Sequence, residues 1–245
     1  MARIMTSFPL RRRPFLAALA GLAAASGASG VQASDPSMKI GIIGAGHVGS
    51  TLAALWVRAG YHVMISSRSL AESQKLSTAL GPLATAGTPG QAAAYGTVVV
   101  LAVPYKAIPQ LGRDLSRTLL DKTILDPSNP YPFRDGVIAD TAEKNGAGIT
   151  TQRYFPSAHV VRAFNSIDMS TLEAEAHRTP PLLAVPVAGD DAASVSRVTD
   201  LVRAAGFDPV VTGGLETARL FQPGSAGFEL ERDAPDLKDA LHLKD

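Results

Sequence analysis

One stretch near the N-terminus, residues 38–68, constrains the fold more than any other part of the chain. It begins with a short apolar run of strand-forming residues, Lys39 to Ile43. Three glycines follow at G-x-G-x-x-G spacing: Gly44, Gly46 and Gly49. An apolar helical pattern then continues to Gly60, and a second apolar run covers Tyr61 to Ile65. Strand, tight turn, helix and strand in this order are typical of a dinucleotide-binding unit.

Each glycine has a separate mechanical task in such a unit. We expect Gly44 to make the turn, Gly46 to let the backbone approach a pyrophosphate, and Gly49 to let the helix lie close to the sheet. The phosphates would lie at the helix N-terminus, where N–H groups and the macrodipole favour negative charge. The alternative is a glycine turn without a ligand, and the flanking strands and helix argue against it.

Strand and helix patterns alternate through the rest of the chain. The predicted strands are residues 83–86, 97–103, 123–126, 159–164, 183–188 and 208–212, and the predicted helices are residues 71–80, 108–119, 137–144 and 190–205. The run TVVVLAV at 97–103 is typical of a strand buried on both faces. The alternation predicts an α/β fold with a doubly wound, mostly parallel sheet. We expect a single domain from residue 34 to 245, with a short, charged helical tail after Gly213.

Residues 1–33 do not continue this pattern. Arg12 and Arg13 precede Pro14 as in a twin-arginine export signal, and an apolar run of Ala, Gly and Leu follows over residues 15–28. That run is too short to cross a bilayer comfortably, and Ala33 ends a plausible cleavage site. We therefore expect a signal peptide cleaved after Ala33, passage through the twin-arginine machinery and a periplasmic location. An uncleaved anchor and a cytoplasmic start at Met38 are the alternatives.

Composition excludes several classes of site. The chain has 245 residues, of which 46% are hydrophobic and 18% charged, as in ordinary globular domains. Beyond residue 33 no basic run remains, so nucleic acid is not expected as a partner. The chain contains no cysteine, which rules out disulfides, thiol catalysis and cysteine zinc sites. The five histidines have no metal-ligand spacing, so no metal site is expected.

The ends of the predicted strands indicate where a ligand would bind. Open parallel sheets bind ligands at the carboxyl ends of their strands. The residues at these ends are Gly44, Ala45, Gly46, His47, Val48 and Gly49, then Ser66, Ser67 and Arg68, then Ala102, Val103 and Pro104, then Asn129 and Pro130, and finally Ala163, Phe164 and Asn165. Small or apolar groups after residue 101 suit a flat ring. Asn129 and Asn165 could bond a carboxamide or an acceptor, or they could simply stabilise turns.

The end of the second strand predicts which dinucleotide binds. An NAD-binding unit usually has an acidic residue there, about 20 residues after the glycines, to bond the ribose hydroxyls. This chain has Ser66, Ser67 and Arg68 instead, and the nearest acid is Glu72. Hydroxyls and a guanidinium suit a 2′-phosphate, which Arg can bind with two parallel hydrogen bonds. The alternative for Arg68 is an ordinary solvated surface charge.

No catalytic acid or base is identified from the sequence. His47 lies in the first turn of the predicted helix, where the dipole disfavours a second proton. None of the tyrosines has a lysine four residues later, and no phosphate-loop motif is present. Trp56 lies on the apolar stripe of the first helix and is expected in the core.

Taken together, these segments resemble a known family. GIIGAGHVGSTLAALWVRAGYHVMISSR, followed in order by LAVPYKAI, ILDPSNPY, VVRAFNSI and GFDPVVTGGLETARLFQP, is similar to the coenzyme F420-dependent NADP oxidoreductases. It is also similar to the cytosolic reductase domain of the STEAP metalloreductases. The likeness extends from Met38 to Pro223. It departs from the family at His47, where Asn is common, and in the predicted export signal.

The resemblance implies a Rossmann domain that binds NADP and exchanges hydride with a flavin-type or deazaflavin acceptor, with a homodimer as the expected assembly. By motif, it implies that Ala45 to Val48, Ser67, Arg68, Val103 and Ala163 line the cofactor, and that Pro130 and Asn165 lie nearer to the acceptor. Two other functions stay open: a dinucleotide sensor without turnover, and a reductase of another small substrate such as an imine. The imine reductases add an all-helical domain, for which the late alternation of strands and helices leaves no room.

Overall fold

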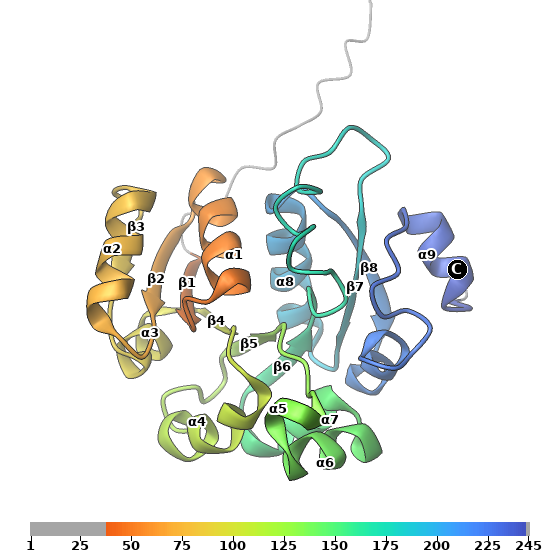
Figure 1. The fold of residues 1–245 in the computed structure, drawn as a ribbon, viewed down its shortest axis with the longest axis horizontal. Helices are drawn as coiled ribbons and strands as arrows, with labels where there is room; N and C mark the ends of the chain where they lie inside the picture. The colour runs from red at the N-terminus through yellow and green to blue at the C-terminus, as the bar shows by residue number, and fades with distance from the viewer. Residues whose placement is uncertain (1–37, 244–245) are drawn as a thin grey trace, which may run out of the picture. The chain divides into compact units, whose positions relative to one another are not determined.

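The computed structural model describes residues 38–243, so the predicted signal peptide and its cleavage site lie outside the described residues. The described residues build one eight-stranded sheet with the order β3-β2-β1-β4-β5-β6-β7-β8 (Figure 1). The strands are β1 Lys39–Ile43, β2 His62–Ser66, β3 Ala84–Ala86, β4 Val98–Leu101, β5 Thr123–Asp126, β6 His159–Arg162, β7 Ala184–Gly189 and β8 Asp208–Gly213. The first six follow the 3-2-1-4-5-6 order of dinucleotide-binding sheets. The predicted fold class, a doubly wound and mostly parallel Rossmann sheet, is confirmed.

Strand β7 breaks the parallel pattern. Strands β1 to β6 pair in parallel, whereas β6 and β7 are antiparallel and β8 is parallel to β7. An antiparallel partner starts at the edge where the previous strand ends, so the connection needs no crossover helix. The connection over residues 163–183 therefore remains at the carboxyl edge of β1 to β6. This places a long irregular segment beside the predicted site.

Helices cover both faces of the sheet (Figure 1). On one face lie α1 His47–Arg58, α2 Leu70–Leu80 and α8 Ala192–Ala204, and on the other lie α3 Pro89–Tyr95, α4 Ile108–Leu115, α6 Val137–Asn145, α7 Ala147–Tyr154 and the 3₁₀ helix η2 Leu215–Phe221. The remaining short elements are η1 Tyr105–Ala107, α5 Pro132–Asp135 and α9 Ala234–Ala240. Two apolar cores result, one on each side of the sheet.

Capping residues explain where several helices begin. The Thr88 hydroxyl accepts a hydrogen bond from the Gln91 N–H, and the Gln91 side chain accepts one from the Thr88 N–H, which is a capping box at the start of α3. Ser69 caps α2 and Asp191 caps α8 with one side-chain hydrogen bond each, accepted from an N–H of the first turn. Sequence reasoning placed α2 and α8 correctly and missed α3.

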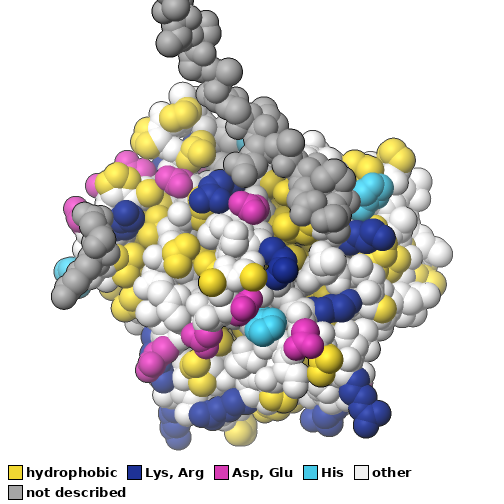
Figure 2. All heavy atoms as spheres, turned by 180° about the vertical axis from the view of Figure 1, so that it is seen from behind, with side chains coloured by type: hydrophobic (Ala, Val, Ile, Leu, Met, Phe, Trp, Pro, Cys, Tyr) yellow, Lys and Arg dark blue, Asp and Glu magenta, His cyan; other side chains and the backbone are white. Residues whose placement is uncertain are grey.

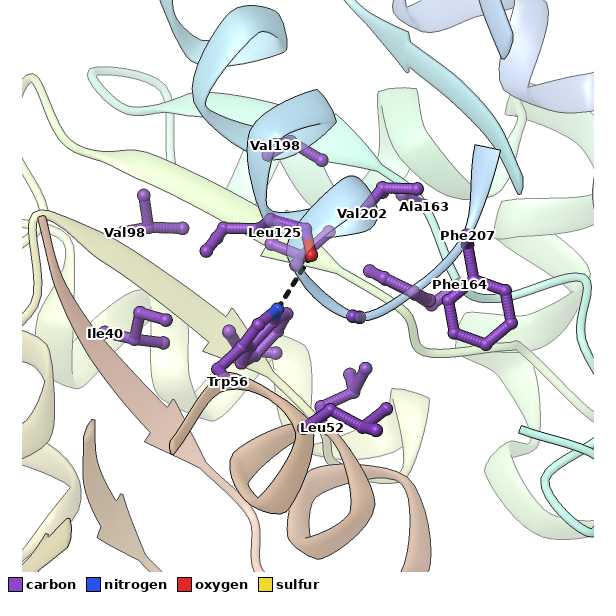
Figure 3. Packing of buried hydrophobic residues seen from close by; sticks show 14 of the residues in the cluster. Ile40, Leu52, Trp56, Val98, Leu125, Ala163, Phe164, Val198, Val202 and Phe207 are labelled. Atoms are coloured by element: carbon purple, nitrogen blue, oxygen red, sulfur yellow. Dashed lines mark hydrogen bonds between the residues drawn. The ribbon is translucent and has the colours of Figure 1, made fainter. Parts of the chain in front are cut away.

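Trp56 joins the first helix to the last large one. Its side chain is fully buried, and its Nε1 donates to the Leu201 carbonyl of α8 at 2.8 Å (Figure 3). Its ring meets Phe164 edge to face with centroids 6.2 Å apart, and Phe164 meets Phe207 in the same way. The prediction that Trp56 belongs to the core is confirmed. The indole therefore ties α1, α8 and the connection after β6 together.

The end of the chain packs more closely than its charge suggests. Leu237 and Leu241 at α9 are buried against Ala184 of β7 and Val210 of β8. No helix among residues 38–243 combines the length and the apolar character that a bilayer crossing requires. Basic and acidic side chains both occur on the face turned away from the view of Figure 1 (Figure 2).

Candidate active site

The three glycines of the first turn differ in what surrounds them. Gly44 has φ +111°, and a Cβ there would lie 2.0 Å from the Ala102 carbonyl oxygen. A Cβ on Gly49 would lie 2.0 Å from the Gly44 carbonyl oxygen, because α1 packs directly on the turn. Gly44 and Gly49 are thus required by the protein itself. Gly46 has an ordinary φ of −72°, and its Cβ would meet no atom within 4 Å.

The N-terminus of α1 is open towards solvent. Gly46 is its N-cap residue and provides no side-chain hydrogen bond, and the first turn contains no acidic residue. The first N–H groups of a helix have no partner within the helix, and the macrodipole places partial positive charge there. His47, also in this turn, is exposed. This end of α1 therefore provides a surface suited to an anion.

A cleft of about 280 Å³ opens beside this helix end, near the lower limit for small-molecule pockets. Eight of the predicted site residues line it: Gly46, His47, Val48, Ala102, Val103, Pro104, Asn129 and Asn165. They come from the ends of β1, β4, β5 and β6, which are neighbours in the sheet. The cleft therefore lies where the strand order reverses between β1 and β4, the position at which open α/β sheets bind their ligands.

Asn165 owes its position to a strained residue before it. Phe164 has φ +62°, a conformation that is costly for a residue with a large side chain. The contacts of its ring with Trp56 and Phe207 hold this conformation in place. Asn165 is 2% exposed; its Nδ2 donates to the Phe221 carbonyl at 2.8 Å, and its Oδ1 has no partner among residues 38–243. A buried amide oxygen without a partner is costly unless a ligand supplies a donor.

A buried ion pair holds the loop after β5. Arg162 Nη1 lies 3.0 Å from Asp126 Oδ2, and both side chains are fully buried. Asp126 also accepts from the N–H and hydroxyl of Ser128 and from the hydroxyl of Thr151. Arg162 donates to the Ser128 carbonyl and to Asn129 Oδ1. The pair therefore fixes residues 127–129, which form one wall of the cleft.

Tyr105 lies behind this ion pair, in the core. Its hydroxyl donates to the Ala147 carbonyl at 2.6 Å and contacts the Thr151 hydroxyl. Burial, together with the negative charge of Asp126, raises the pKa of Tyr105 far above its ordinary value. Its role is structural, because it does not line the cleft.

The next wall of the cleft consists of Tyr131 and the helix α5. The Tyr131 ring stacks on Phe133 at 5.6 Å between centroids, and the Arg134 guanidinium lies 5.0 Å from its centre. Arg134 pairs with Asp135 at 2.8 Å and donates to the Asn129 carbonyl. Burial raises the pKa of Tyr131. Tyr131 therefore presents a neutral phenol to the cleft.

Asp135 holds the start of α5 in place. Burial by itself would raise the pKa of Asp135, but hydrogen bonds from Arg134 and from the N–H groups of Tyr131 and Lys106 hold it below its ordinary value. The carboxylate is thus charged at neutral pH and neutralises Arg134. The Arg134 side chain is therefore not a free cation in the cleft.

Nine lining residues were not among the predicted site residues: Pro127, Ser128, Tyr131, Arg134, Phe164, Ile167, Asp168, Met169 and Glu229. Phe164 ends a predicted strand, and the sequence alone assigns it no role. Tyr131 follows Asn129 in ILDPSNPY, so its place in that segment was an available signal. Asp168, Met169 and Glu229 belong to irregular segments without a local pattern. Only the antiparallel β7 and the return of the chain along η2 bring them to the cleft.

The remaining predicted residues lie outside the cleft. Arg68 is exposed after β2, and the Ser67 hydroxyl bonds within its own turn, donating to the Ser69 carbonyl at 2.7 Å. Ser66 is buried, and its hydroxyl donates to the Ile42 carbonyl. Its own carbonyl accepts from the Gly44 N–H at 2.8 Å, so its contacts hold the glycine turn. Gly44, Ala45 and Gly49 form and support that turn, and Ala163 and Pro130 are buried behind the cleft wall.

Comparison with known proteins finds a family model that matches this region. Residues 39–130 match the model of the family described as NADP oxidoreductase coenzyme F420-dependent. A crystal structure from Arthrobacter sp. FB24, of a protein inferred to be an F420-dependent NADP reductase, is 27% identical with a TM-score of 0.65. That match covers 74% of this chain and 87% of the other. The resemblance predicted from the sequence is confirmed for the matched region.

Two curated relatives are similar at the same level. Metalloreductase STEAP3 of Rattus norvegicus is 27% identical over 74% of this chain and 35% of that protein. An NADPH-dependent reductive aminase of Aspergillus oryzae is 26% identical over 77% of this chain and 65% of that protein. This chain thus spans between about a third and two thirds of the length of these relatives. The family to which residues 39–130 are matched is one of NADP-dependent oxidoreductases.

Proposed function

From this family match we propose that the protein is an NADPH-dependent reductase that passes hydride between NADP and a flavin-type or deazaflavin acceptor. The match supports the class, an NADP-dependent oxidoreductase. The acceptor is our inference from the resemblance over Met38 to Pro223 and from the lining of the cleft.

The environment of Gly46 is the observation that carries the proposal. Neither its φ nor its neighbours require glycine, and an N-cap Ser or Asp would satisfy the helix better. A glycine at this position is explained if a ligand must approach the backbone closely. The pyrophosphate of a dinucleotide at the N-terminus of α1 meets that requirement.

The adenosine half of the cofactor would lie at the carboxyl end of β2, outside the cleft. Arg68 is exposed there, and no acidic residue precedes Glu72 in that turn. Because the Ser67 hydroxyl already donates to the Ser69 carbonyl, we assign the 2′-phosphate to the Arg68 guanidinium, which supports NADP over NAD.

The other half of the cofactor would enter the cleft between α1 and residues 102–104. NADPH, when bound, would supply the hydride. Ala102, Val103 and Pro104 offer an apolar wall, and Asn165 lines the same cleft. Hydride transfer needs the two rings held about 3–3.5 Å apart in the correct orientation. The contribution of this chain is therefore positioning and exclusion of water, with no acid or base required on the hydride itself.

The decisive test is turnover. Purified protein is mixed with NADPH and a panel of flavins and deazaflavins, and NADPH oxidation is followed at 340 nm. The proposal expects oxidation faster than in Gly46→Trp, whose side chain would occupy the phosphate position. NADPH binding without oxidation by any acceptor would instead favour a dinucleotide sensor.

Location and assembly are part of the same proposal. We place the mature protein in the periplasm, exported in folded form with NADP already bound, on the basis of Arg12 and Arg13 in the sequence. We also propose a homodimer, which sedimentation of the purified protein would test.

A further inference from the structure

The Tyr131 hydroxyl proton has no acceptor among residues 38–243. Tyr131 lines the cleft and is partly exposed. Its ring is held by the stack on Phe133 and by the Arg134 guanidinium, and its backbone N–H donates to Asp135. Its hydroxyl oxygen is not one of the buried polar atoms that lack a partner in this part of the chain. The ring is therefore fixed by the protein, whereas the hydroxyl is open to the cleft.

The neighbouring Asn129 amide fits its surroundings in only one of its two orientations. Its Oδ1 faces two donors, Arg162 Nη2 and Asn165 Nδ2, each at 3.4 Å. Its Nδ2 donates to the Asn165 carbonyl at 2.7 Å. The reversed amide would place N–H against N–H and oxygen against oxygen at these contacts. Arg162, which Asp126 holds at 3.0 Å, thus helps to fix which end of the amide is the donor.

This orientation decides what the Tyr131 hydroxyl can do. Burial raises the pKa of Tyr131, and a hydrogen bond from the Asn129 side chain lowers it by less. A phenol has a single proton to donate, and an amide N–H cannot accept it. The Tyr131 O–H is therefore left to donate to a ligand in the cleft, and it keeps its proton at neutral pH.

We propose that Tyr131 is a catalytic residue whose hydroxyl donates a hydrogen bond to a carbonyl oxygen of the acceptor's pyrimidine ring. This inference rests on the proposed function and adds a residue to the same site. The C4–H bond of NADPH breaks, and its electron pair moves with the hydrogen to the acceptor ring. NADPH is oxidised to NADP⁺, and the acceptor is reduced to an anion whose charge is spread over the pyrimidine ring. Tyr131 keeps its proton and stabilises that charge.

The hydrogen bond should strengthen as the hydride moves. Loss of a bond to a neutral oxygen typically weakens binding about two- to tenfold, and loss of a bond to a charged oxygen about ten- to a hundredfold. Only the difference between the two states, about tenfold, accelerates the hydride step, because a bond of constant strength changes binding alone. The proposal therefore predicts two separate effects, one on acceptor affinity and one on rate.

Tyr131→Phe removes the hydroxyl and keeps the ring on Phe133. FMN and coenzyme F420 are the probes, because both contain the pyrimidine carbonyls. With saturating NADP⁺ we expect the Kd of the probe, followed by its fluorescence, to rise about two- to tenfold. With bound NADPH we expect the single-turnover rate of hydride transfer to fall about tenfold. The Kd of NADP⁺ should not change.

Tyr154→Phe is the matched control, because Tyr154 is a partly buried tyrosine outside the cleft. It should leave both the acceptor Kd and the hydride-transfer rate unchanged. Wild-type affinity and rate in Tyr131→Phe, or equal losses in the two variants, would overturn the inference and leave the proposed function intact. Wild-type protein that binds NADP⁺ and neither probe would overturn both this inference and the proposed acceptor.

Asn129→Asp tests the orientation of the hydroxyl. The carboxylate can still face Arg162, but it accepts the Tyr131 O–H and so turns the proton away from the ligand. In this background Tyr131→Phe should change the hydride-transfer rate less than about twofold, because coupled residues are not additive. A tenfold loss from Tyr131→Phe in both backgrounds would overturn the role of Asn129.

Discussion

The contrast between Gly46 and Gly49 allows the phosphate site to be tested separately from the fold. A Cβ on Gly46 meets no atom within 4 Å, and the φ of −72° suits any residue. Gly46→Ala should gain about 0.4–1 kcal/mol from the stiffer unfolded chain. It should lose a similar amount because Ala is a poor N-cap. We therefore expect the free energy of unfolding of the apoprotein to change by less than about 1 kcal/mol.

The same position should control dinucleotide binding. In Gly46→Val the side chain would occupy the space assigned to the pyrophosphate. Each charge-assisted hydrogen bond to a phosphate that is lost costs about 1.5–3 kcal/mol, which is about ten- to a hundredfold in affinity. We expect NADPH affinity to fall at least a hundredfold, because more than one N–H group at the end of α1 is blocked, while far-UV circular dichroism remains native.

Gly49→Ala is the matched control. Its Cβ would lie 2.0 Å from the Gly44 carbonyl oxygen and 3.1 Å from the Ala102 Cβ, so α1 must move away from the sheet. Overpacking of this kind typically costs about 1–3 kcal/mol of stability. Urea unfolding and NADPH titration are measured on Gly46→Ala, Gly46→Val and Gly49→Ala. Wild-type NADPH affinity in Gly46→Val, or equal losses of stability in Gly46→Ala and Gly49→Ala, would refute the reasoning.

Four further predictions concern other parts of the chain. Wild-type protein should bind NADPH at least tenfold more tightly than NADH, and Arg68→Ala should weaken the binding of NADPH alone. If titration shows that Arg68→Ala loses affinity for both cofactors equally, Arg68 does not bind the 2′-phosphate. Asp126→Ala leaves Arg162 buried without its partner and should cost about 3–5 kcal/mol in urea unfolding; a cost below 1 kcal/mol would contradict this account of the ion pair. The pKa of Asp135 lies below its ordinary 3.8, so the hydrogen bonds of its carboxylate stabilise the fold above that pH, and this stability is lost as the pH falls through the lowered pKa. Asp135→Asn should therefore reduce the loss of unfolding free energy that accompanies acidification. An unchanged loss in the variant would assign the acid sensitivity to other carboxylates. Arg12→Lys with Arg13→Lys should keep the protein inside the cell on fractionation, and normal export of this double variant would exclude the twin-arginine route.

The sequence alone determined the first half of the fold and the glycine turn beside the cleft. The unit from β1 to β2 could be predicted because its signals are local: an apolar run, glycines at fixed spacing and a helical stripe containing Trp56. The strand-end rule then placed Asn129 and Asn165 in the cleft, since parallel strands end at one edge. Alternation also carried the sheet correctly to β8.

Other elements left no pattern to read. Helices α3 and α7 consist largely of Ala, Gly, Thr and Gln, so they show little apolar periodicity. A capping box begins α3, and the packing of Gly148 against Arg162 and Leu215 supports α7. Their existence depends on a sheet face that is already present, because short helices gain most of their stability from tertiary contacts.

Only the tertiary structure decided which irregular segments complete the cleft. The direction of β7 is set by its pairing with β6, and that pairing keeps residues 163–183 beside the site. Asp168 and Glu229 are far apart in the chain and line one cleft. The cofactor class could therefore be read from local motifs, whereas the part of the cleft lined by Asp168, Met169 and Glu229 depends on how distant segments meet.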